Sequence, residues 1–162
     1  MAFDYSLDFD QINFREQPEL YRVGKGEQGV LMVEPYKSEI LQHWRFKNPE
    51  IATESSDKIY SMFLDYLKHD DFVGADMARK FLQMGYTRAR RYANHKSGRK
   101  YKSNPQNAGS KSAEKEARKE VLPRKEDPIK AKAAAIFKVK WEEAKTNQKY
   151  QKMQKAHKEQ YG

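Results

Sequence analysis

Apolar residues recur at helical spacing over two long stretches in the middle of the chain. In the first stretch, from Pro49 to about Lys68, the positions sharing one face are Ile51, Ser55, Ile59, Met62, Phe63 and Tyr66. In the second, from Phe72 to about His95, they are Val73, Met77, Phe81, Met84, Ala89 and Tyr92. Asn48 and Asp71 precede the two stretches and are of the residue types that cap helix N-termini. Because the connection 69–71 is short, residues 49–95 are expected to form an αα-hairpin.

The N-terminal part shows a different pattern. Aromatic and acidic residues alternate between Phe3 and Phe14, which indicates an extended arm lying on the core. Two apolar runs, residues 20–23 and 30–33, flank the glycine-dense segment Gly24–Gly29. Such runs around a glycine turn predict a β-hairpin, which Pro35 would end because proline donates no ladder hydrogen bond.

The C-terminal part begins with a stretch of linker composition and ends in helical patterns. Residues 102–125 form a basic, low-complexity loop that we expect to be helical at most transiently. Asp127 and Pro128 then mark a helix start, and Thr146-Asn147 separates that helix from a short terminal one. The chain is therefore predicted to be one domain, 1–162, of α+β class, mainly α. Its expected architecture is an N-terminal arm and β-hairpin packed on the αα-hairpin plus a C-terminal helix.

Charge is distributed unevenly along this pattern. Residues 1–71 hold 8 Lys/Arg against 14 Asp/Glu, a net charge of −6, whereas residues 72–162 hold 24 against 9, a net charge of +15. The segment from Arg79 to Lys125 has 15 basic and 3 acidic residues, or +12. This asymmetry indicates either a polyanionic partner, most often nucleic acid, or neutralisation of one half by the other.

Composition narrows the class of protein further. The 12% aromatic content argues against a disordered chain despite 34% charged residues. The absence of cysteine excludes disulfides, thiolate zinc sites and cysteine nucleophiles. No apolar run approaches the ~20 residues of a membrane span, and the acidic start lacks the features of a secretory signal. We therefore expect a cytoplasmic protein without a membrane partner.

The strongest functional candidate is a basic, aromatic-containing segment at the end of the second predicted helix. Guanidinium groups bind phosphates in bidentate fashion, and aromatic rings offer stacking surfaces for bases. On a helix Arg88, Arg91, Tyr92 and His95 would share one face. The expected nucleic-acid-binding residues are Arg88, Arg90, Arg91, Tyr92, Asn94, His95, Lys96, Arg99, Lys100 and Tyr101. Two alternatives stay open: these cations pair with the acidic front half, or they are simply solvated.

The other motifs give weaker evidence for a function. Gly24-x-Gly26-x-x-Gly29 matches the dinucleotide-binding pattern, but a predicted strand follows it where that site requires a helix, so a tight turn is the favoured interpretation. The four histidines show no metal-ligand spacing. No set of residues suggests a general acid and base. We expect no catalytic residue, no cofactor and no metal, although a hidden activity stays an alternative.

Several phrases of the chain resemble a known family. They are Gly26-Glu-Gln-Gly-Val-Leu-Met-Val-Glu-Pro-Tyr-Lys, Arg45-Phe-Lys, Ala78-Arg-Lys-Phe-Leu-Gln-Met-Gly and Arg90-Arg-Tyr-Ala-Asn-His-Lys. The chain is similar over nearly its full length, apart from the linker around 102–120, to a domain of unknown function found in bacteria, some eukaryotes and tailed phages. The resemblance implies a small stand-alone intracellular protein and transfers no catalytic residue or ligand.

The expected function is therefore non-catalytic binding of nucleic acid, directed at the backbone and with little sequence specificity. A protein-interaction or regulatory module that docks an acidic partner protein is the alternative. A nucleotide-handling enzyme that uses Gly24–Gly29 is a more distant one.

Overall fold

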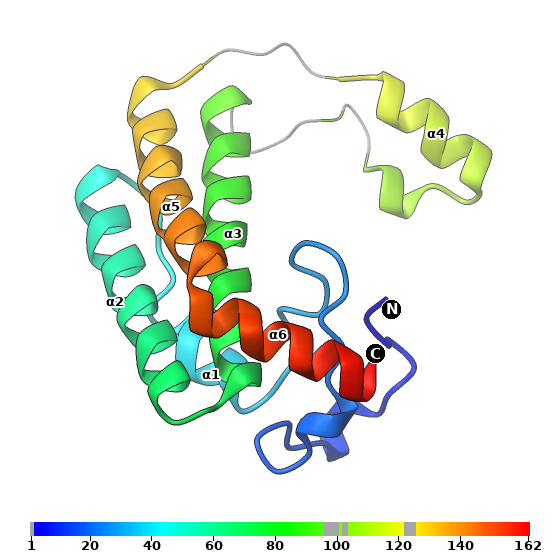
Figure 1. The fold of residues 1–162 in the computed structure, drawn as a ribbon. Coiled ribbons are helices and arrows are strands. Elements are labelled where there is room, and N and C mark those ends of the chain that lie inside the picture. Colours follow the sequence, from blue (N-terminus) through cyan, green and yellow to red (C-terminus); the bar gives the residue numbers. More distant parts are fainter. Residues whose placement is uncertain (1, 96–100, 102–103, 122–125) are drawn as a thin grey trace.

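The computed structural model describes residues 2–95, 101, 104–121 and 126–162. Over these residues the fold is helical, and its centre is α3 (Phe72–Asn94), on which α2 (Pro49–Lys68) and α5 (Pro128–Thr146) pack (Figure 1). The short helix α1 (Tyr36–Leu41) and the terminal helix α6 (Gln148–Tyr161) complete the main body. A further helix, α4 (Lys111–Lys119), packs on the 3₁₀ turn η4 (Pro105–Asn107) and is drawn apart from the bundle.

The helices begin where the sequence predicted caps. The Asn48 side chain accepts a hydrogen bond from the Ile51 amide at 2.9 Å, and Asp71 accepts one from the Gly74 amide at 3.0 Å. Asp127 likewise caps α5. These side-chain acceptors satisfy amides that have no partner inside the helix. The two predicted helices of the central hairpin are therefore present as α2 and α3.

The prediction of an α+β fold with a β-hairpin is wrong. The two predicted strands do not pair with each other, and the described residues contain only one isolated β-bridge, between Tyr101 and Val121. Residues 25–32 instead form successive turns, in which the amides of Gln28, Val30 and Met32 each donate to the carbonyl three residues earlier.

The side-chain pattern shows why these turns replace a strand. Val30 and Val33 are buried while Leu31 and Met32 are exposed, a spacing of three rather than the two of a strand. Gly26 and Gly29, with φ of 57° and 77°, adopt the left-handed conformation that the turns need and that glycine allows. Pro35 consequently precedes α1 and does not end a strand.

Two 3₁₀ turns, η1 (Phe9–Gln11) and η2 (Pro18–Leu20), interrupt the N-terminal segment. The predicted basic loop 102–125 contains α4, which is a formed helix where we expected transient helicity at most, while residues 102–103 and 122–125 lie outside the described part.

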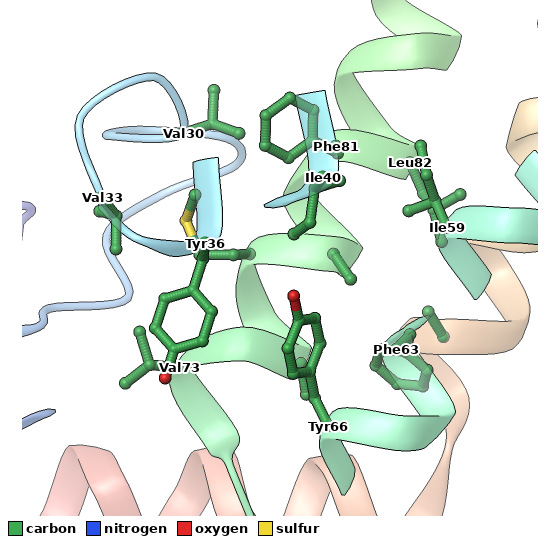
Figure 2. Close-up of a cluster of buried hydrophobic side chains, with 14 of the residues drawn as sticks. Val30, Val33, Tyr36, Ile40, Ile59, Phe63, Tyr66, Val73, Phe81 and Leu82 are labelled. Atoms are coloured by element: carbon green, nitrogen blue, oxygen red, sulfur yellow. The ribbon is translucent and has the colours of Figure 1, made fainter. Parts of the chain in front are cut away.

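The core lies between α3 and the elements around it (Figure 2). Helix packing is close at two glycines of α3, where a Cβ would lie 2.5 Å from the Tyr66 ring at Gly74 and 2.3 Å from the Phe137 ring at Gly85. The labelled core side chains, in chain order, are Val30, Val33, Tyr36, Ile40, Ile59, Phe63, Tyr66, Val73, Phe81 and Leu82.

Candidate nucleic-acid interface

The predicted basic segment begins at the end of α3, where this helix leaves the core. From Phe72 to Gly85 nearly every residue of α3 is buried, whereas four of the next nine residues are exposed: Thr87, Arg88, Arg91 and Tyr92. Neither Arg88 nor Arg91 has a carboxylate within ion-pair distance among the described residues. Both guanidinium groups are therefore available to an external anion.

Arg90 differs from its neighbours. Its guanidinium lies 3.1 Å from the Glu126 carboxylate, and the Arg90 side chain is 28% exposed against 52% for Glu126. A pair this open to solvent contributes little to stability and can exchange its partner. Glu126 belongs to the basic residues 72–162, so this contact is not the predicted neutralisation of basic residues by the acidic residues 1–71.

The expected stripe of Arg88, Arg91, Tyr92 and His95 is incomplete in the structure. Helix α3 ends at Asn94, and His95 has an extended backbone (φ −137°, ψ 127°), so helical spacing does not set the direction of its side chain. The Tyr92 ring lies 5.9 Å from the ring of Phe46 and is 41% exposed. It thus has one covered side and one available to solvent.

Asn94 and His95 line a small cavity of about 210 Å³ together with four residues of α3: Tyr86, Thr87, Arg90 and Arg91. His95 is only 6% exposed. Asn94 Oδ1 and His95 Nδ1 are both shielded from water and have no hydrogen-bond partner among the described residues. Buried polar atoms are nearly always paired in folded proteins, so two adjacent exceptions mark the end of α3 as unusual.

The remaining predicted site residues are only partly described. Lys96, Arg99 and Lys100 lie outside the described residues. Tyr101 forms the isolated bridge with Val121, beyond the end of α3. The structure therefore groups Arg90, Arg91, Asn94 and His95 around one cavity and leaves Arg88 and Tyr92 beside it.

One acidic residue of the front half reaches this face. Glu27 Oε2 lies 3.4 Å from the hydroxyl of Thr87. Burial raises the pKa of Glu27, and the charges of Arg88 and Arg91 partly oppose that rise. Glu27 is therefore within electrostatic range of both exposed arginines without forming an ion pair with either.

Other contacts between the acidic front and the basic back are made elsewhere. Lys140 lies 3.5 Å from Asp57, and Lys149 lies 3.0 Å from Asp70. Both pairs join α5 or α6 to the α2 side of the molecule. They do not involve Arg88 or Arg91, which have no ion-pair partner among the described residues.

A second group of cations, which the sequence analysis did not single out, extends this face onto α5. Lys138 Nζ lies 5.6 Å from the ring centre of Tyr86, and Lys145 Nζ lies 4.7 Å from that of Trp141. The two rings stack on each other at 5.8 Å. The spacing of Lys138, Trp141 and Lys145, which puts all three on one face of α5, could have indicated this group from the sequence.

The glycine-dense segment has a structural task that the sequence analysis also missed. Arg79 donates to the carbonyl of Gly26 at 2.6 Å, and Lys80 donates to the carbonyl of Gln28 at 2.6 Å. Both side chains are buried and share Asp76, at 2.7 Å from Arg79 and 3.9 Å from Lys80. Two buried cations thus hold the glycine segment against α3 and are not available to a ligand.

Asp76 is the centre of this buried cluster. Its carboxylate accepts hydrogen bonds from the hydroxyls of Tyr21 and Tyr150, the latter at 2.5 Å. Burial by itself would raise the pKa of Asp76, but the charges of Arg79 and Lys80 outweigh it and lower that pKa. Asp76 is therefore ionised and balances two cations inside the protein.

Three of the six backbone amides of Gly24–Gly29, those of Lys25, Gln28 and Gly29, donate to acceptors within the protein. Gly29 N donates to the Tyr5 hydroxyl at 3.1 Å, and Lys25 N donates to Gln28 Oε1 at 2.9 Å. A phosphate cradle needs free amides that converge on one point. The geometry argues against a nucleotide site at Gly24–Gly29.

Neither a metal-binding cluster nor a membrane-spanning helix occurs among the described residues. No group of three or more histidine or carboxylate side chains there could hold a metal ion. In the same part of the chain, no helix combines the length and apolar character needed to cross a bilayer.

Comparison with known proteins gives one match. A family model described as "Domain of unknown function (DUF4385)" matches residues 4–160. No curated protein and no solved structure matches the chain.

Proposed function

Because the chain belongs to this family of unknown function, we propose a function from its surface: it binds nucleic acid without catalysis, through a basic face at the C-terminal end of α3. The proposal includes the cytoplasmic location expected from the sequence. The occurrence of relatives in bacteria, some eukaryotes and tailed phages stays a prediction of the resemblance.

The observation that carries the proposal is that Arg88 and Arg91 are exposed and have charges that no nearby carboxylate of the described residues neutralises. Arg79 and Lys80, on the same helix, are neutralised by Asp76 and occupied by backbone carbonyls. Arg88 and Arg91, by contrast, are exposed and have no ion-pair partner among the described residues. Guanidinium groups of this kind are the usual phosphate-binding groups of proteins.

The face is large enough to follow a strand of nucleic acid. Gln83, Thr87, Arg90, Arg91 and Asn94 recur on one side of α3, a length of roughly 17 Å at 1.5 Å per residue. Lys138 and Lys145 extend it onto α5, where they lie over the stacked rings of Tyr86 and Trp141. Cations and aromatic rings together are typical of surfaces that bind single strands without strong sequence preference.

The proposal is tested by fluorescence anisotropy with labelled single- and double-stranded probes at a series of salt concentrations. If roughly four to six phosphates are neutralised, the logarithm of affinity falls by about 0.7 to 0.9 per phosphate for each log unit of salt. The double variant Arg88→Ala/Arg91→Ala should flatten this slope by about 1.5 to 2. Melting temperature should hardly change, because neither side chain is buried or has an ion-pair partner in the described part of the chain.

The matched control removes two exposed lysines elsewhere. Lys58→Ala/Lys68→Ala makes the same change in net charge on α2, beside the cavity that Glu39 and Asp65 line. It should leave the slope unchanged. Absence of binding to any probe at ~50 mM salt, or an equal effect of the two double variants, would contradict the proposal.

A third variant uses the acidic neighbour of the face. Glu27→Gln removes the carboxylate that lies near Arg88 and Arg91, so the affinity for nucleic acid should rise by a few fold at low salt. If the face instead docks an acidic protein, polyglutamate should compete with nucleic acid at equal charge concentration. That result would favour the alternative function.

A further inference from the structure

A second cavity lies where α3, α5 and α6 meet the glycine-dense segment (Figure 1). It measures about 360 Å³, within the roughly 300–1,000 Å³ of sites for small molecules. Its wall includes Gly26, Gln83 of α3, Trp141 and Lys145 of α5, and Lys158 of α6. We call it the α6 cavity. No aspartate or glutamate of the described residues lines it.

Two cations of this wall have no counter-charge. Lys145 and Lys158 are both exposed, and neither forms an ion pair within the part of the chain that the structure describes. Lys145 Nζ lies 4.7 Å from the ring centre of Trp141, a contact that attracts the ammonium group without neutralising it. Both ammonium groups are therefore available to an anion in the cavity.

A buried cluster beside the cavity adds a further positive charge. Arg79 and Tyr150, which are 6% and 2% exposed, also line the cavity. Arg79 and Lys80 share a single carboxylate, that of Asp76, so the cluster contains two cations and one anion. Buried charges are weakly screened and act strongly on their surroundings. An anion in the cavity would offset this excess through the field of Arg79, whose N–H groups already donate inside the protein.

One donor of the wall has an orientation that the protein fixes. Gln83 Oε1 accepts a hydrogen bond from Arg79 Nη1 at 2.9 Å. Arginine offers only donors, so this contact assigns the amide oxygen to the Arg79 side and turns the NH₂ group away. The NH₂ nitrogen lies 3.3 Å from the position that a Cβ on Gly26 would take, at the cavity wall. It has no acceptor among the described residues.

Trp141 supplies a second neutral donor. Its Nε1–H has no acceptor in the described part of the chain, whereas Trp44 Nε1 donates to the Phe81 carbonyl at 3.0 Å. Gln151 and Gln154 also line the cavity, and their amide oxygens are acceptors without charge. The described charged side chains around the cavity are thus all cationic, and neutral donors stand beside them.

We propose that the α6 cavity binds a phosphate monoester, with Lys145 and Lys158 as its counter-charges and Gln83 as a neutral donor. Such a group carries about two negative charges and three acceptor oxygens, which matches two ammonium groups beside a cluster with excess positive charge. A carboxylate offers one charge and two oxygens. The phosphate can belong to a small phosphorylated molecule or to the 5′ end of a nucleic-acid strand. The inference goes beyond the proposed function, since Arg88 and Arg91 lie outside this cavity.

The test titrates inorganic phosphate into ¹⁵N-labelled protein near neutral pH, with chloride adjusted to keep ionic strength constant. The two tryptophans give two indole N–H signals in NMR spectra. The Trp141 signal should shift and saturate at millimolar phosphate, whereas that of Trp44, whose N–H is already bonded, should stay in place. Acetate at equal ionic strength should shift the Trp141 signal much less.

The variant that tests the charge is Lys158→Gln. It should weaken phosphate binding by about two- to fivefold, as expected for the loss of one exposed ion pair. The matched control is Lys152→Gln, which makes the same charge change at an exposed position of α6 outside the cavity and should leave phosphate binding unchanged.

Two single strands of about 12 nucleotides, with and without a 5′ phosphate, identify the source of the phosphate. A strand end is the ligand if the 5′ phosphate raises affinity in wild type and not in Lys158→Gln. A small phosphorylated molecule is the ligand if the 5′ phosphate has no effect while inorganic phosphate binds.

Three results would overturn the α6 cavity as a phosphate site. They are the absence of a saturable shift at Trp141, equal shifts of both indole signals, and equal phosphate affinities of Lys158→Gln and Lys152→Gln. None of them bears on binding through Arg88 and Arg91, which the salt dependence of Arg88→Ala/Arg91→Ala tests separately.

Discussion

Lys80 should contribute more to stability at pH 10 than at pH 8, whereas a surface lysine, whose pKa hardly changes on folding, would contribute equally at both. Its side chain is fully buried, with Nζ 2.6 Å from the Gln28 carbonyl and 4.8 Å from the ring centre of Tyr21. Burial lowers the pKa of Lys80 from 10.5 to about 8, although Asp76 opposes the change.

The direction of the effect follows from proton binding. Between pH 8 and 10.5 the folded protein releases the Lys80 proton while the unfolded chain keeps it, so raising the pH favours the folded state. The contribution is absent below about pH 8 and complete above 10.5. With 1.36 kcal/mol for each pH unit between the two pKa values, it amounts to about 3 kcal/mol in total and about 2 kcal/mol by pH 10.

The upper limit of the window is set by the buried tyrosines. Burial raises the pKa of Tyr21 and Tyr150. Burial likewise raises the pKa of Tyr36 and Tyr66. From about pH 9 the unfolded chain begins to lose tyrosine protons that the folded protein keeps, which lowers stability by about 0.4 kcal/mol per tyrosine at pH 10. The effect of Lys80 is therefore measured as a difference between proteins that share these tyrosines and differ at residue 80.

Urea denaturation followed by circular dichroism measures the effect. Between pH 8 and pH 10 Lys80 should raise the wild-type midpoint by about 1 M relative to a protein without this lysine, given a slope of roughly 1–3 kcal/mol per M. Lys80→Met should lose this rise, whereas Lys58→Met, at an exposed site on α2, should keep it. All three proteins share the general benefit of approaching their isoelectric point, so the comparison between variants is decisive. An equal pH dependence in wild type and Lys80→Met would contradict a lowered pKa of Lys80.

Three further predictions concern stability. Asp76→Asn leaves two buried cations without their counter-charge and should lower the free energy of unfolding by about 3–5 kcal/mol in denaturant titration. Circular dichroism at low denaturant checks that the variant is folded, and a stability equal to that of the wild type would contradict the prediction. Gly85→Ala places a Cβ 2.3 Å from the Phe137 ring and should destabilise the protein by about 1–3 kcal/mol. Gly109→Ala, whose Cβ would lie in open space, should leave stability unchanged. Equal melting temperatures of the two variants would contradict close packing of α3 on Phe137. His157 Nε2 lies 2.7 Å from the Tyr21 carbonyl oxygen, and burial lowers the pKa of His157. The wild type should therefore lose stability as pH falls below 6.5, and His157→Gln should lose less. Parallel curves of stability against pH for the two proteins would contradict this.

The long helices were predictable because their signals are local. The caps at Asn48, Asp71 and Asp127 and the 3.6-residue periodicity that follows each depend only on nearby positions. The break at Asn147 is local for the same reason, since its side chain caps the next helix by accepting from the Tyr150 amide at 2.9 Å. The mainly helical character of the chain could be predicted for this reason.

The glycine-dense segment was misinterpreted because short apolar runs do not distinguish a strand from a series of turns. Val30 to Val33 contains four apolar residues in a row, and only the fold shows that its two valines face the core while the residues between them face solvent. What selects the turns is distant in sequence: Arg79 and Lys80 on α3 bind the carbonyls of Gly26 and Gln28.

The long helices α2, α3 and α5, their caps and the strong charge asymmetry could be predicted from the sequence alone, because each is a property of neighbouring residues or of composition. Which cations are available to a ligand depends on the tertiary structure, because packing between distant segments buries some of them and leaves others exposed. Arg79 and Lys80 count toward the +12 of residues 79–125 yet are buried around Asp76, whereas Arg88 and Arg91 stay exposed.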